Sequence, residues 1–184
     1  MDSSTIVIDL LLHKYKADQK WTRIVIEQLS EEDLSWSPTP ESNSIANLIA
    51  HISGAARYWF DVAYYGAPMN EYRSIEFERG LQMSKDQALK ISKKSYDSII
   101  GVLEMMKANP ERLLEQPYLH YPPFDSGALN NECTVLEMFL HQFRHLPSHT
   151  GQIIYSKNEE GEFSVGLKLR SANESFITLT DSYF

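Results

Sequence analysis

The stretch "NSIANLIAHISGAARYWF", residues 43 to 60, carries the cleanest amphipathic helix pattern in the chain. Asn43 or Ser44 is a suitable N-cap, and Gly66 and Pro68 end the pattern. Between these signals, apolar side chains recur every three or four residues, as they do on one face of an α-helix. They are Ile45, Leu48, Ile49, Ile52, Ala56, Trp59, Phe60 and Ala63. The stretch therefore predicts a helix that buries one face against other helices.

Three further stretches have the same period. Residues 5–29 form the first of them, and it ends before "SWSPTPES", whose two prolines forbid a helix. Residues 83–110 begin with Ser84 and Gln87 in the spacing of a capping box. Residues 133–158 begin with the same arrangement, which is formed here by Thr134 and Glu137.

Four long amphipathic helices predict an all-α fold, specifically a four-helix bundle. Two connections are short to moderate, and one, residues 115–132, is long and rich in proline. The tail differs from the bundle, because "FSVGLKLRS" and "SFITLTDSY" alternate apolar and polar residues as short strands do. We expect a single domain over residues 1–184, with a core at about 5–157 and an irregular or strand-like tail at 158–184.

The composition restricts the class of protein. A formal charge of −8, from 17 basic and 25 acidic residues, disfavours nucleic acid and anionic membranes as partners. No stretch reaches the roughly 20 apolar residues that cross a bilayer. The single cysteine, Cys133, cannot form an internal disulfide, which is typical of a reducing cytoplasm. We therefore expect a cytoplasmic protein in which Cys133 is a small buried side chain.

Histidines dominate the stretch "HQFRHLPSHTGQI", residues 141 to 153. His145 and His149 are one helical turn apart and lie within the apolar stripe, so both should face the core. Two such imidazoles either hydrogen-bond within the core or bind a metal, and spacing alone favours neither interpretation. His51 lies at the flank of its own helix's apolar stripe and could reach across to them. His141 falls at the edge of the stripe.

Other common chemistries lack their motifs. No Glu follows His145 in the manner of zinc proteases, and the chain has no Gly-x-Ser-x-Gly, phosphate-binding glycine loop or cysteine pair. His13 and His120 have no spacing argument and are interpreted as surface or loop residues.

Two stretches together resemble the DinB-like superfamily, which includes bacillithiol S-transferases. The first stretch is "SWSPTPESNSIANLIAHISGAARYWF". Its Trp-x-Pro and Asn-Ser-Ile-Ala elements are similar to the family's segment at the start of the helix that carries one metal histidine. In "HQFRHLPSHTGQIIY" the His-x-x-x-His followed by Gly-Gln-Ile is similar to its second metal motif. The order of helices matches over roughly residues 5–157.

The resemblance implies a metal bound by His51, His145 and His149, with a coordination position open to water or substrate. It also implies a bundle of up-down-down-up connectivity with one long crossover, and a homodimer. Three imidazoles suit zinc or nickel first and iron or manganese as alternatives. A low-molecular-weight thiol is a candidate cosubstrate.

Several neighbouring residues are candidates for supporting roles. Asn47, Gln152 and His141 could orient the metal ligands, although exposed polar positions explain the first two nearly as well. Pro147 lies between the two helical histidines, and we expect it to kink the helix there. A group of four aromatic residues either lines the mouth of a pocket or packs in the core and at interfaces, and we favour the second interpretation. They are Tyr58, Trp59, Tyr64 and Tyr65.

The leading hypothesis is a metal-dependent enzyme that acts on a small molecule, either a thiol S-transferase or a hydrolase. One alternative is a non-catalytic bundle that binds a metal or ligand, which a fourth protein ligand such as His141 would favour. The other is a structural dimeric bundle without metal.

Overall fold

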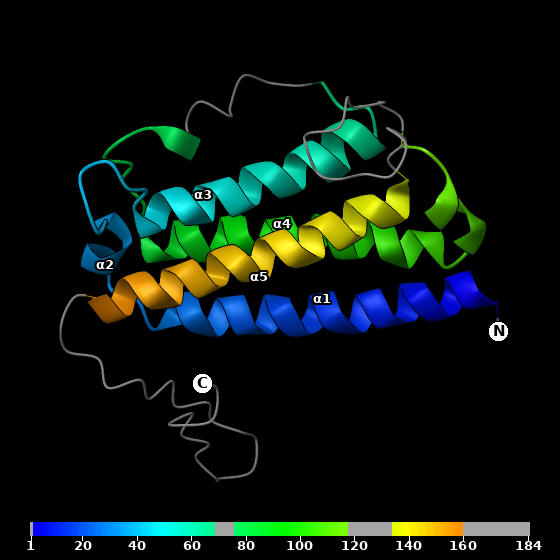
Figure 1. The fold of residues 1–184 in the computed structure, drawn as a ribbon, viewed down its shortest axis with the longest axis horizontal. Coiled ribbons are helices and arrows are strands. Elements are labelled where there is room, and N and C mark those ends of the chain that lie inside the picture. The colour runs from blue at the N-terminus through cyan, green and yellow to red at the C-terminus, as the bar shows by residue number, and fades with distance from the viewer. Residues whose placement is uncertain (1, 69–75, 118–133, 160–184) are drawn as a thin grey trace, which may run out of the picture.

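The computed structural model describes residues 2–68, 76–117 and 134–159, and within these ranges the regular structure is entirely helical (Figure 1). The four long helices are α1 (Ser3–Glu27), α3 (Ile45–Ala56), α4 (Lys85–Met106) and α5 (Val135–Glu159). The shorter elements are α2 (Glu31–Ser35), η1 (Arg57–Tyr64) and η3 (Pro110–Leu114). The predicted strands of the tail, and the predictions for Cys133 and His120, lie outside the described residues.

The predicted four-helix bundle and its connectivity are confirmed. Helix α1 packs against α4 and α5, and α3 packs against the same two helices, so α1 and α3 lie diagonally across the bundle. Figure 1 shows α1 and α5 running in one direction and α3 and α4 in the other. Because α3 and α4 are parallel, the chain must cross the length of the bundle between them. Glu76 lies on this crossover.

The predicted helix starts are confirmed by their capping hydrogen bonds. Ser84 and Gln87 form a complete capping box at α4, and Ser44 forms one with Asn47 at α3. At α5, the backbone N–H of Thr134 donates to the Glu137 carboxylate at 2.7 Å. These side chains satisfy backbone donors that have no partner within the helix.

The bundle core is mainly apolar, but it contains a buried network of hydroxyl groups. Its largest fully buried side chains include Tyr15, Tyr96, Phe60 and Phe139. The buried hydroxyl of Thr22 lies 2.9 Å from that of Tyr96 and 3.1 Å from that of Thr150. This network joins α1, α4 and α5 at the centre of the bundle.

The predicted second helix does not stay α-helical to its end. After Ala56 it widens into the π-helix η1, in which the N–H of Tyr65 donates to the carbonyl of Phe60 at 3.3 Å. Gly66 then turns the chain with a φ of 69°. The four aromatic residues of this region divide as follows: Tyr58 is buried, Trp59 and Tyr64 pack against the core, and Tyr65 is exposed.

Helix α5 continues through Pro147 to Glu159. Proline has no N–H to donate to the carbonyl of Phe143, so this turn lacks one helical hydrogen bond. His145 and His149 nevertheless remain in one helix, one turn apart. No helix of the described ranges is both long and apolar enough to cross a membrane.

Candidate metal centre

Three histidines from two helices converge at one point inside the bundle. The Nε2 atom of His145 lies 3.1 Å from Nε2 of His51 and 3.0 Å from Nε2 of His149. The candidate ligand atoms of the three rings all lie within 4.8 Å of one another. The convergence expected from the two motif stretches is therefore present in the structure, and these histidines could bind a metal ion.

The helices themselves produce this arrangement. His145 and His149 face the same way because residues four apart on a helix differ by only about 40° in direction. His51 lies on α3, which packs directly against α5. A pair on one helix and a third residue on the neighbouring helix therefore place three imidazoles around one point.

Two of the rings are held from behind by hydrogen-bond acceptors. Nδ1 of His51 lies 3.0 Å from Oε2 of Glu76, and Nδ1 of His149 lies 2.7 Å from Oε1 of Gln152. Both oxygens are acceptors, so each Nδ1 carries the proton that it donates. The Nε2 atoms of these two rings consequently present lone pairs toward the convergence point, as metal-ligating histidines do.

The electrostatic surroundings keep the central histidine neutral. Burial, together with the neighbouring His149 and His51, lowers the pKa of His145 to about 3. Burial also lowers the pKa of His149, although its hydrogen bond with Gln152 acts in the opposite direction. At neutral pH His145 is uncharged, which is the form that binds a metal.

The donor set fits a divalent transition metal. Two imidazole nitrogens that each lie about 2.1 Å from one ion, at angles between roughly 90° and 110°, are about 3.0 to 3.4 Å apart. The separations of Nε2 of His145 from Nε2 of His51 and of His149, 3.1 and 3.0 Å, lie in this range. Hydrogen bonding alone accounts for them less well, because Nε2 of His145 carries at most one proton and faces two lone pairs.

The other residues expected near the site are placed as follows. Gln152 contacts His149 directly, as described above. Asn47 is buried and donates to the carbonyl oxygens of Glu76 and Glu78, at 3.0 and 2.9 Å, so it reaches the histidines through the crossover segment. His141 stacks beside His145, with ring centroids 5.8 Å apart, and contacts Trp59. His141 is not part of the convergent group.

Glu76 is the site residue that sequence reasoning missed. Its carboxylate is buried, with a side chain only 5% exposed, and pairs with His51. In the sequence it lies 25 residues after His51, outside any periodic stretch. The sequence does not predict this residue, because the contact between Glu76 and His51 depends on the tertiary packing of Glu76 against α3.

A hollow of about 640 Å³ adjoins the site on the side of Gln152. It lies between the loop that precedes α3 and the last turns of α5, and its lining includes Asn43, Ser148 and Tyr155. Its size falls within the range of sites that bind small molecules. The hollow shares Gln152 with the histidine cluster.

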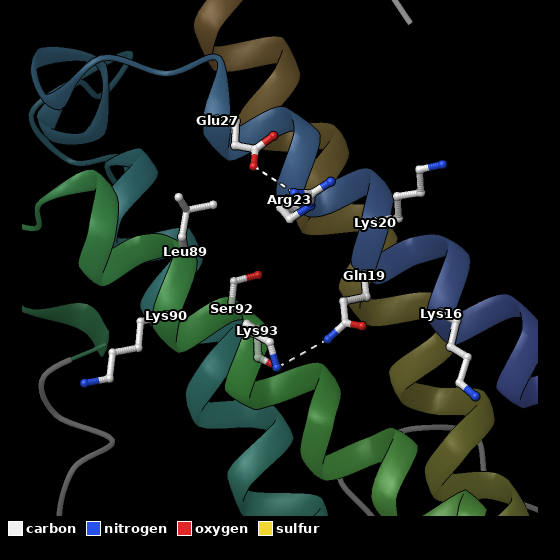
Figure 2. Close-up of a pocket in the computed structure, with 9 residues that line it drawn as sticks. All are labelled: Lys16, Gln19, Lys20, Arg23, Glu27, Leu89, Lys90, Ser92 and Lys93. Atoms are coloured by element: carbon white, nitrogen blue, oxygen red, sulfur yellow. Dashed lines mark hydrogen bonds and ion pairs between the residues drawn. The ribbon is translucent and has the colours of Figure 1, made fainter. Parts of the chain in front are cut away.

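A second hollow, a groove of about 630 Å³ between α1 and α4, lies apart from the histidines (Figure 2). Its lining is mainly basic, but its cationic groups do not converge. Arg23 pairs with Glu27 at 3.1 Å and Lys16 with Glu104 at 2.6 Å. Figure 2 shows Lys20 and Lys90 pointing away from each other on opposite rims. The histidine cluster is therefore the stronger candidate for a functional site.

Comparisons with known proteins agree with the fold. A family model described as "Protein of unknown function (DUF1572)" matches residues 2–164. Among solved structures, a DinB-like protein (YjoA) from Bacillus subtilis is similar, with 16% identity and a TM-score of 0.57. The similarity covers 84% of this chain and 94% of that chain. No curated protein matches. These findings show that the fold is similar to that of a DinB-like protein.

Proposed function

This chain belongs to the DUF1572 family, and from its histidine cluster we propose that it is a metal-dependent enzyme acting on a small molecule. The observation that carries the proposal is the convergence of His51, His145 and His149, in which Nε2 of His145 lies 3.1 and 3.0 Å from Nε2 of the other two rings. Zinc or nickel are the proposed metals, with iron or manganese as alternatives.

Three protein ligands are the number that catalytic metal sites provide, since they leave a coordination position for water or substrate. A divalent metal held there supplies Lewis acidity, which lowers the pKa of a bound water or thiol and provides a nucleophile near neutral pH. The reaction proposed is thiol S-transfer or hydrolysis. In either case Glu76 and Gln152 hold two ligand rings in the neutral tautomer with Nε2 free.

The hollow beside Gln152 supports a small-molecule substrate rather than a macromolecule. Its lining is mixed. Pro38 and Leu48 are apolar, Glu41 carries a carboxylate, and the other side chains, which include Ser42, Asn43, Ser148 and Tyr155, are potential hydrogen-bonding groups. A small substrate bound there would contact Gln152, whose side chain holds the ligand His149.

The test is an absorption titration of the cobalt(II)-loaded protein with a low-molecular-weight thiol. We expect a new thiolate-to-cobalt band in wild type that is absent from His145→Ala, followed by turnover of an electrophile or of an activated ester. A cobalt spectrum that neither thiol nor azide changes would mean a closed coordination sphere. It would favour the alternative function, a non-catalytic metal-binding bundle.

We also propose that the bundle is a homodimer. Large apolar side chains are exposed one turn apart on α1, where Ile6 is 46% and Leu10 58% exposed. Light scattering should give twice the chain mass for wild type. The monomer mass should appear in the double variant Ile6→Lys, Leu10→Lys. The control variant Lys14→Gln, on the same helix, should remain a dimer.

A further inference from the structure

One face of α3 holds the crossover segment in place at three successive turns. Asn47, His51 and Gly54 are spaced four and three residues apart, so they lie along a single stripe of the helix. Asn47 binds the backbone of the crossover through the carbonyls of Glu76 and Glu78. His51 binds the Glu76 carboxylate at 3.0 Å. The third residue, Gly54, contributes by having no side chain.

The absence of a side chain at position 54 provides the space that the carboxylate occupies. A Cβ added at Gly54 would lie 1.7 Å from Oε1 and 2.3 Å from Cδ of Glu76. Real atoms cannot approach so closely, so any larger residue must displace the carboxylate. Glycine inside a helix normally costs up to about 1 kcal/mol relative to alanine, and close approach of another group is one reason to accept that cost.

The clash would be relieved locally. The atoms that a Cβ would meet are the end of a flexible side chain, and Asn47 holds the backbone of Glu76 independently. Substitution at Gly54 should therefore move the Glu76 carboxylate away from His51 and leave the bundle folded.

We propose that Glu76 is a positioning residue for the metal ligand His51, and that Gly54 is required for it to act. The Glu76 carboxylate accepts a hydrogen bond from Nδ1–H of His51. This bond fixes the orientation of the ring and leaves the lone pair of Nε2 free to bind a metal. This inference rests on the proposed function for the role of the metal. Carboxylates behind metal-bound histidines typically affect metal affinity about 10- to 100-fold when they are removed.

The experiment is a double-mutant cycle on metal affinity, measured by competition with a chromophoric chelator for zinc. The variants are Gly54→Ala, Glu76→Ala and the combination of the two. Gly101→Ala is the matched control, because Gly101 lies in the exposed part of α4 and a Cβ there meets nothing within 4 Å. We expect Gly54→Ala and Glu76→Ala each to weaken zinc binding about 10- to 100-fold. The double variant should be no weaker than Glu76→Ala, because the clash no longer exists.

Two results would overturn the inference: zinc affinity of Gly54→Ala equal to wild type, or a double variant weakened by the product of the two single effects. If zinc binding requires His145 but is unaffected by both Gly54→Ala and Glu76→Ala, the proposed metal site stands and only the roles of Glu76 and Gly54 are wrong. If wild type binds none of zinc, nickel, iron and manganese, the proposed function fails. Imidazole ¹⁵N spectra of the metal-free protein then still test the positioning. In wild type and in Gly101→Ala, His51 should be the Nδ1–H tautomer. In Gly54→Ala and in Glu76→Ala, His51 should lose this preference.

Discussion

The Nε2 atoms of His51 and His145 lie 3.1 Å apart, although 94 residues separate them in the chain. The contact joins α3 to α5, two helices that are adjacent and antiparallel in the bundle. Because His149 approaches His145 from the next turn of α5, the bundle brings a third nitrogen to the same point. An ion bound there would connect two helices, so metal binding and stability of the fold should be coupled.

Removal of metal should lower the thermal stability of wild type. A ligand that binds only the folded state and is present at 100 times its dissociation constant stabilises that state by about 2.7 kcal/mol. We expect dialysis against a chelator to lower the melting temperature of zinc-loaded wild type, measured by calorimetry. His145→Ala should melt at one temperature with or without chelator, and His13→Ala, altered at an exposed position of α1, should respond like wild type. A wild-type melting temperature that is indifferent to chelation would contradict this coupling.

Gln152→Ala should weaken metal binding with little effect on folding. The substitution removes the 2.7 Å hydrogen bond to Nδ1 of His149, while the residue itself is exposed and contributes little to the core. We expect an affinity loss of about tenfold in a chelator competition titration. Gln28→Ala, at the exposed end of α1, should bind like wild type. Equal affinities for the two variants would show that Gln152 does not support the ligand.

Tyr96 should give the bundle a stability that is lost in alkali. Burial raises the pKa of Tyr96 to about 12, whereas an unfolded tyrosine ionises near 10. The Tyr96 hydroxyl thus stays protonated to a higher pH in the folded state than in the unfolded state. Its contribution to the free energy of unfolding is therefore complete below about pH 10 and disappears as the pH rises through 12. At pH 7, Tyr96→Phe should lower the free energy of unfolding by about 1 kcal/mol, because the hydrogen bond with Thr22 is lost. Above pH 10, the free energy of unfolding should fall less steeply in Tyr96→Phe than in wild type.

Denaturant unfolding at several pH values measures this difference. Tyr155→Phe is the control, since Tyr155 is 63% exposed. Its unfolding free energy should follow that of wild type at every pH. Parallel alkaline losses in wild type and Tyr96→Phe would rule out Tyr96 as the source.

Phe139→Ala should destabilise the fold strongly. Phe139 is fully buried, and its ring packs against that of Phe60 with a centroid distance of 5.0 Å. Such substitutions cost about 3–5 kcal/mol, because they remove apolar contacts and leave a cavity. The next residue, Leu140, is 50% exposed, and Leu140→Ala should change the unfolding free energy by only about 0.5 kcal/mol. Similar losses in both variants would mean that the orientation of α5 is different.

The bundle was predictable because its signals are local. The capping boxes at Ser84 and Thr134 mark helix starts within four residues, and the apolar period identifies the buried faces. The short helix α2 was missed, although its capping box, formed by Ser30 and Asp33, uses a similar spacing. The widening into η1 was missed because a π-helix has no comparable local pattern.

The histidines were predictable and their support was not. His145 and His149 share a helix face by spacing, and resemblance added His51. Glu76 reaches His51 only because the crossover lies on α3, a tertiary contact that no periodicity encodes. The role of Gly54 was not predictable either. A helical glycine indicates close packing only once the neighbouring atoms that occupy the space of its missing side chain are known.

The most direct test of the account is the metal content of the untagged protein, measured by elemental analysis after dialysis. Wild type is compared with the His145→Ala, His149→Ala double variant and with His13→Ala at equal concentration. We predict about one transition-metal ion per chain in wild type and His13→Ala, and close to none in the double variant. Equal metal content in wild type and the double variant, or none in wild type after incubation with zinc and with nickel, would contradict a three-histidine metal centre.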